Sequence, residues 1–244
     1  MLHFYISLEA EKNKLMDMFC VGEVAATHAY RAKQYHFPWR LAQKMYHEPR
    51  FQWDEQLEDF LAQSYQENEA RLHTSKAFFE SYWQMNEHKY FPKLNQFFQE
   101  EIPEYRVLLA HFLDAISNWT EPNIVINAYS YQTKNPLYHI YSLLYEITLS
   151  QVFIRTRKLK TKEEFSDDKL WMSAELTSFA FLTTTFPEFS EWHGTGYPRL
   201  DTYADQFVKL MQENKSFNLI LPEILRFKFD TGDKIWYSAR YTND

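Results

Sequence analysis

Glu146 is the residue whose type and position could most directly do chemistry in this chain. It lies in an apolar helical pattern, with Tyr145 before it and Leu149 three residues after it. A glutamate between two metal ligands that are one helical turn apart can act as the general base for a metal-bound water. Here the two ligand positions hold a tyrosine, which is an uncommon zinc ligand, and a leucine, which has no lone pair. The pattern therefore keeps the base and lacks both ligands.

A second glutamate, Glu175, follows 29 residues after Glu146, within the run Ser-Ala-Glu-Leu-Thr-Ser-Phe-Ala. The order of a strand, a loop, a helix with Glu146 and a helix with Glu175 resembles that of the gluzincin metallopeptidases, over about residues 75–225. The resemblance implies that Tyr145 and Leu149 replace the two histidines of the His-Glu-x-x-His motif. It also implies that Glu146 stands at the position of the general base and Glu175 at that of the third zinc ligand.

The same resemblance implies a fold and a groove. The fold class is α+β and mainly helical: a zincin-like single domain over residues 1–244 with a small mixed sheet, either undivided or with two lobes at 1–135 and 136–244. In this family the strand before the active helix borders the substrate cleft, and residues 123–130, rich in β-branched side chains, fit that strand. We expect its free edge to pair with an extended peptide, and the groove to include Ile124, Ile126, Ala128 and Tyr129.

Two functions follow from these residues. Without two imidazoles zinc is not held, so the first is a peptide- or protein-binding module that has lost peptidase activity and needs no cofactor. The alternative is a metal-dependent hydrolase with a rearranged zinc site, made by His139, Glu146, Glu175 and His193. In the first case two neighbouring buried carboxylates would repel each other, so we expect at least one of them to be protonated or to recruit a partner such as His139, Tyr145 or a lysine.

A simpler interpretation stays open at this point. Polar residues recur at spacings of three and four along residues 137–154 and could form one face of an ordinary amphipathic helix: His139, Ser142, Glu146 and Ser150. The chain would then be an unrelated helix-rich domain, and Glu146 a residue of its polar face.

Charge and composition exclude several classes of function. The net charge of −7 repels a phosphate backbone, so we expect no nucleic-acid partner. Only four glycines occur in 244 residues, and neither a phosphate-binding loop nor a dinucleotide fingerprint is present. The single cysteine, Cys20, rules out an intrachain disulfide. The sequence shows no basic leader and no apolar run of about 20 residues, so we expect a cytoplasmic protein without membrane partners; its oligomeric state stays open.

Periodicity predicts the elements that would position these residues. Apolar and aromatic residues at intervals of three and four predict helices at residues 9–33, 53–73, 75–91, 93–100, 137–154, 170–182, 198–213 and 217–225. Strands are predicted at residues 3–7 and 123–130, whereas residues 105–112 are ambiguous between helix and strand. The run Asp-Thr-Gly-Asp at 230–233 predicts a C-terminal hairpin. Gly194 and Gly196 predict a turn with unusual backbone angles or a close approach to a ligand.

Overall fold

The computed structural model describes most of the chain: residues 1–20, 55–113, 116–129, 137–159, 167–192, 194–195 and 197–229. These residues form a mainly helical α+β structure with one small mixed sheet, which confirms the predicted fold class at this level. The predicted C-terminal hairpin lies outside the described residues. The helix expected at residues 9–33 is described only as far as Cys20.

The sheet contains four strands in the order β1-β2-β4-β3. They are β1 (Leu2–Tyr5), β2 (Tyr105–Ala110), β3 (Ile116–Ser117) and β4 (Asn123–Asn127). Strands β1, β2 and β4 are parallel, and β3 pairs with β4 in the antiparallel sense. The segment that was ambiguous in the sequence is thus β2, which is hydrogen-bonded to a neighbour on both sides.

Helices cover both faces of this sheet. α1 (Leu8–Cys20) and α4 (Glu55–Phe98) precede β2 in the chain, whereas α5 (Tyr138–Leu159) and α6 (Asp167–Thr185) follow β4. The chain then continues through four short elements: η2 (Pro187–Phe189), α7 (Pro198–Asp201), α8 (Ala204–Glu213) and α9 (Phe217–Arg226). No described helix combines the length and the apolar character that crossing a membrane requires.

The long helix α4 corrects the prediction of three separate helices between residues 53 and 100. It is one helix of 44 residues that passes through Ser75 and Pro92 without ending. Ser75 fits inside because its hydroxyl donates to the carbonyl of Arg71, one turn earlier, at 2.9 Å. Pro92 lacks an N–H to donate, but buried rings on both sides of it, Tyr90 and Phe97, hold the helix against the core.

Alternate residues of the strands serve two cores, one on each face of the sheet. On one face, Val107 of β2 stands beside Ile124 of β4 in the main core. On the other face, Leu108 stands beside Val125 in a smaller core that also contains Leu15 of α1, as well as Leu61, Phe112 and Leu113. β2 therefore has no polar face, because both of its faces are buried.

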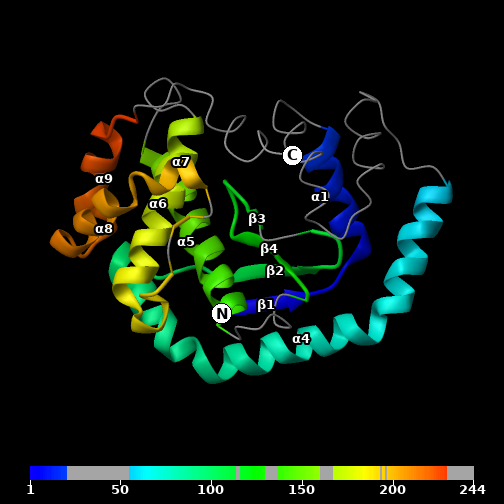
Figure 1. Cartoon of the computed structure of the whole chain (residues 1–244). Helices are drawn as coiled ribbons and strands as arrows, with labels where there is room; N and C mark the ends of the chain where they lie inside the picture. Colours follow the sequence, from blue (N-terminus) through cyan, green and yellow to red (C-terminus); the bar gives the residue numbers. More distant parts are fainter. Residues whose placement is uncertain are drawn as a thin grey trace.

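Figure 1 shows how the helices surround the sheet. α4, in teal, passes along the β1 side, while α5, α6 and the later helices stand together at the left of the view and α1 stands at the right. The main core includes residues from Leu2 in β1 to Ile224 in α9. One connected core thus joins elements from both ends of the described chain.

Candidate functional site

Tyr145 of α5 and Glu175 of α6 meet where these two helices pack side by side. The Tyr145 hydroxyl donates to Glu175 Oε2 at 2.6 Å and lies 3.0 Å from the main-chain oxygen of the same residue. Both side chains are buried, with exposed fractions of 8% and 6%. Burial and the nearby charge of Glu175 raise the pKa of the Tyr145 phenol well above its usual value, so it stays a neutral proton donor. The positions likened to the first and third zinc ligands are therefore bonded directly to each other.

Glu146, at the position likened to the general base, points to the sheet. The hydroxyl of Ser117 in β3 contacts the Glu146 carboxylate and lies 3.0 Å from the Glu146 main-chain oxygen. We expected at least one of the two glutamates to be protonated or to recruit His139, Tyr145 or a lysine. Glu175 does bond to Tyr145, whereas Glu146 contacts a serine that the sequence did not single out.

Leu149 completes the set of positions likened to metal ligands. It is only 5% exposed and belongs to the main core, where it fills space without offering a donor atom. Among the described residues, no three histidine, cysteine, aspartate or glutamate side chains are arranged to hold a metal ion. Of the three positions likened to zinc ligands, only Glu175 thus carries a side chain of the usual ligand kind, and it is bonded to a phenol.

The position of His139 disagrees with the alternative site, in which it was joined with Glu146, Glu175 and His193. Its ring is fully buried against α4, with ring centroids 5.0 to 5.6 Å from those of three aromatic residues: Phe78, Phe79 and Tyr82. Neither ring nitrogen has a hydrogen-bond partner among the described residues. His193 lies outside those residues. The imidazole of His139 therefore packs as an aromatic core residue, since the face of α5 that carries it meets α4.

Replacing His139 by phenylalanine should remove an acid-sensitive part of the stability. Burial lowers the pKa of His139 from 6.5 to about 4, so this side chain takes up a proton near pH 6.5 when unfolded and near pH 4 when folded. The folded state therefore loses stability as the pH falls through this window, by up to about 3 kcal/mol. The free energy of unfolding in urea should fall less between pH 7 and pH 4.5 in His139→Phe than in the wild type. The exposed His88→Gln variant should behave as the wild type, and equal falls in all three proteins would contradict the prediction.

The predicted groove strand is a buried central strand, which corrects that prediction. β4 lies between β2 and β3, so it has no free edge at Ile124 and Val125. The side chains of Ile124, Ile126 and Ala128 belong to the main core, and Tyr129 is buried with them. The outer strand is β3, and its two residues are too short a run to show a periodic pattern in the sequence.

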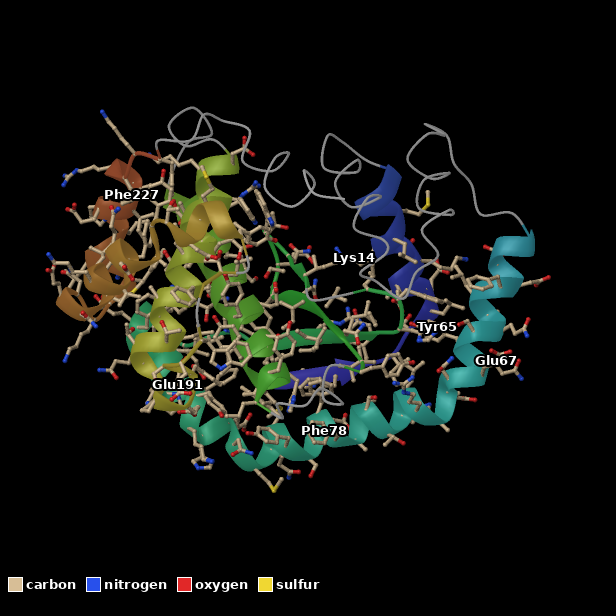
Figure 2. The ribbon with its side chains drawn as sticks, viewed as in Figure 1. Lys14, Tyr65, Glu67, Phe78, Glu191 and Phe227 are labelled. Carbon is tan, nitrogen blue, oxygen red and sulfur yellow. The ribbon has the colours of Figure 1, made fainter. Side chains whose placement is uncertain are left out.

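A buried polar centre around Glu11 was missed by the sequence argument. The Glu11 carboxylate accepts three main-chain hydrogen bonds just after β2, from the N–H groups of His111 at 2.9 Å, Phe112 at 2.6 Å and Leu113 at 3.1 Å. It also accepts the hydroxyl of Tyr65, which lies between α4 and α1 (Figure 2). Burial raises the pKa of Glu11, against the opposing effect of these four bonds. Glu11 thus connects α1 and α4 to the C-terminal end of β2.

A serine and a histidine meet beside this centre. Ser64 Oγ lies 2.8 Å from His111 Nε2, and His111 Nδ1 lies 2.6 Å from the hydroxyl of Tyr129. Such a pair could activate a serine, but an acyl transfer also needs N–H groups that are free to bind an oxyanion. The three consecutive N–H groups nearby are bonded to Glu11. We therefore interpret this chain of hydrogen bonds as structural.

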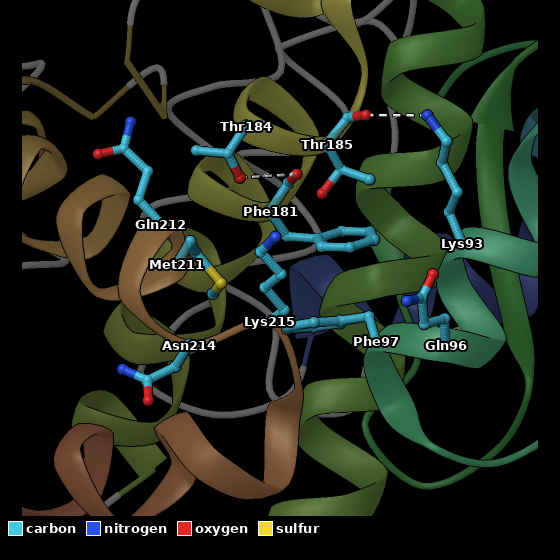
Figure 3. Close-up of a pocket in the computed structure, with 10 residues that line it drawn as sticks. All are labelled: Lys93, Gln96, Phe97, Phe181, Thr184, Thr185, Met211, Gln212, Asn214 and Lys215. Atoms are coloured by element: carbon cyan, nitrogen blue, oxygen red, sulfur yellow. Dashed lines mark hydrogen bonds between the residues drawn. The ribbon is translucent and has the colours of Figure 1, made fainter.

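Two adjoining pockets lie along α6 and α8. The first, which we call the lysine pocket, has a volume of about 380 Å³ and is lined by Lys93, Phe97, Phe181, Met211 and Lys215 among others (Figure 3). The second, the aspartate pocket, has a volume of about 730 Å³ and is lined by Phe179, Trp192, Gly194, Asp201, Asp205 and Val208 among others. Thr184 and Gln212 line both pockets, so the two share a wall.

The aspartate pocket explains the glycine predicted to have unusual backbone angles. Gly194 has a φ of +90°, and a Cβ at this position would lie 2.6 Å from a carboxylate oxygen of Asp201. Asp201 Oδ1 in turn accepts the N–H of Thr195 at 2.6 Å and its hydroxyl at 2.9 Å. The close approach is therefore that of a side chain of the same chain, and it fixes Asp201 in the pocket wall.

Comparison with known proteins identifies no relative of this chain. No family model, curated protein or solved structure matches the chain.

Proposed function

We propose that this chain is a non-catalytic peptide-binding module with a framework like that of the gluzincin metallopeptidases. The observation that carries the proposal is the 2.6 Å hydrogen bond from Tyr145 to Glu175. In the gluzincin arrangement, a zinc ion is bound between the residues at these two positions. Here the phenol itself reaches the carboxylate, and a charge-assisted hydrogen bond stands where two metal bonds would be.

The chemistry of the remaining residues supports binding without cleavage. A glutamate base in this family acts on a water whose pKa the metal has lowered. Glu146 contacts the Ser117 hydroxyl, and Leu149 has no atom that could bind zinc. A peptide held at such a site would not meet an activated water, so the function that fits these residues is recognition.

The binding surface in this proposal is the outer edge of β3. Among the described residues β3 pairs with β4 alone, so no described strand occupies its other edge, although Ser117 is only 9% exposed. The N–H of Asn118 donates to the carbonyl of Asn123 at 3.1 Å, and in an antiparallel pair the bonded residues alternate along the strand. The N–H and C=O of Ser117 therefore point away from β4, where an extended peptide can pair with them.

The test compares two substitutions at Ser117 on an array of random-sequence peptides. Ser117→Pro removes the outward N–H, whereas Ser117→Ala keeps it and removes only the hydroxyl that contacts Glu146. We expect the wild type and Ser117→Ala to bind a common set of peptides. Ser117→Pro should bind them about tenfold more weakly, because a main-chain hydrogen bond to the peptide is lost.

Circular dichroism must first show that both variants are folded as the wild type is. Equal binding by the proline and alanine variants would exclude the β3 edge as the binding surface. Failure of the wild type to retain any peptide would reject the module, and cleavage of the array peptides by the wild type would replace it with an enzyme.

A further inference from the structure

The lysine pocket and the aspartate pocket adjoin each other and their described linings carry opposite charges; we call the two together the groove. Among the described lining residues, the first pocket has Lys93 and Lys215 and no carboxylate, and the second has Asp201 and Asp205 and no lysine or arginine. Because Thr184 and Gln212 line both pockets, the pockets are neighbours, and a ligand that occupies both must pass over these two residues. The charges then favour a ligand with a cationic end and an anionic end.

Each end of the groove has one charge that is fixed and one that is available. Lys93 donates to the carbonyl of Thr185 at 3.0 Å, and Asp201 is bonded to Thr195, so these two belong to the walls. Lys215 and Asp205 are exposed, and neither makes an ion pair among the residues that the structure describes. These two side chains are therefore placed to pair with the ends of a ligand.

The length of α8 sets the size of that ligand. Asp205 and Gln212 are seven residues apart on this helix, which corresponds to about 10 Å along its axis. Lys215 follows two residues after the helix ends at Glu213, so it lies at the Gln212 end of this span. An extended peptide rises by about 3.3 to 3.6 Å per residue, so three or four residues span this distance.

The floor of the groove is apolar. In the lysine pocket the rings of Phe97 and Phe181 stack with their centroids 4.2 Å apart, and Met211 lies beside them with only 5% of its surface exposed. Figure 3 shows these three side chains together, with the Lys215 side chain beside them. A pocket of this kind accepts an apolar side chain, while the amide of Gln212 can bond to a peptide group.

We propose that the groove binds a short peptide of three or four residues with free termini. Its ammonium group pairs with Asp205, its carboxylate pairs with Lys215, and an apolar side chain lies on Phe97 and Phe181. This site is separate from the β3 edge and does not depend on it, because the groove is made by α4, α6, α8 and the loops beside them.

The experiment is calorimetric titration of the full chain, at low ionic strength, with three forms of the peptide Ala-Leu-Ala. One form has both termini free, one is N-acetylated and one is C-amidated. We expect the free peptide to bind best and each cap to weaken binding by about fivefold, which is the effect of one exposed ion pair.

Two variants identify the partner of each terminus. Asp205→Asn should weaken binding of the free and the amidated peptide and leave the acetylated peptide unchanged, because acetylation has already removed the ammonium group. Lys215→Gln should weaken binding of the free and the acetylated peptide and leave the amidated one unchanged. Lys209→Gln and Glu213→Gln serve as matched controls, because these exposed residues of α8 pair with each other at 3.9 Å and do not line either pocket.

Three results would overturn the proposal. They are no binding of the free peptide at millimolar concentration, equal affinity for capped and free peptides, and losses in the Lys209 or Glu213 controls as large as those in the groove variants. Because Ser117→Pro does not touch the groove, retained tripeptide binding in that variant separates the two sites.

Discussion

Replacing Glu11 by alanine should lower the free energy of unfolding by about 3 to 5 kcal/mol, measured by urea denaturation at pH 7. The carboxylate is fully buried and accepts the N–H groups of His111, Phe112 and Leu113 together with the Tyr65 hydroxyl. Alanine leaves the three N–H groups buried without this acceptor, and since each such group costs about 1 to 3 kcal/mol, the loss is at least about 3 kcal/mol. A loss of this size is a large part of the 5 to 15 kcal/mol that typically stabilises a protein.

Two further substitutions show whether the loss of stability is specific to Glu11 or follows from any loss of a carboxylate on α1. Glu9→Ala removes an exposed carboxylate from the same helix and should cost less than about 1 kcal/mol. Tyr65→Phe removes one of the bonds to Glu11 and should lie between the two, so it tests the centre even where Glu11→Ala does not fold. A loss in Glu11→Ala no larger than that in Glu9→Ala would show that the three N–H groups do not depend on the carboxylate.

Two histidines introduced at positions 145 and 149 should turn the chain into a zinc protein. In the double variant Tyr145→His, Leu149→His, two imidazoles one turn apart on α5 join Glu175 of α6 in a set of three ligands. Elemental analysis after dialysis should find about one zinc per chain in this variant and far less in the wild type. Added zinc should raise the thermal midpoint of the variant alone, because metal that binds only the folded state stabilises it.

The control for this gain is a third substitution, Glu175→Gln. The amide keeps the size of the side chain and is a weak zinc ligand, so the triple variant should bind much less zinc than the double variant. Equal zinc contents would remove Glu175 from the ligand set. A double variant that unfolds cooperatively and takes up no zinc would reject the gluzincin framework itself.

The sequence located α5 by its apolar pattern and β4 by its β-branched residues, although both faces of β4 are buried, and it failed for β2 and α4. The helix expected at residues 137–154 is α5, Tyr138–Leu159, and the strand expected at 123–130 is β4, Asn123–Asn127. β2 was ambiguous because burial on both faces removes the alternation of polar and apolar residues. α4 was divided at Ser75 and Pro92 because local propensity does not include the packing that keeps the helix intact.

The candidate site likewise contains contacts that the sequence could indicate and contacts that it could not. The sequence led us to expect that one of Glu146 and Glu175 would be protonated or recruit a partner, and Tyr145, one of the partners named there, bonds to Glu175. The contact of Glu146 with Ser117 could not be predicted, because it depends on where a strand of two residues pairs. Glu11 was invisible for a related reason: its partners are main-chain groups about 100 residues away, and main-chain groups leave no mark in a sequence.

The pairing of β1 with β2 has a consequence for how the chain reaches this structure. Leu2 aligns with Tyr105, and Glu11 bonds to His111, so two separate anchors of the sheet each close a loop of about 100 residues. Contacts this distant slow folding, because the entropy of loop closure is lost before the contacts form. At a synthesis rate of about 5 to 20 residues per second, β1 is made roughly 5 to 20 s before β2, the strand with which it pairs. For that time Leu2 and Phe4, buried in the finished protein, stay available to chaperones.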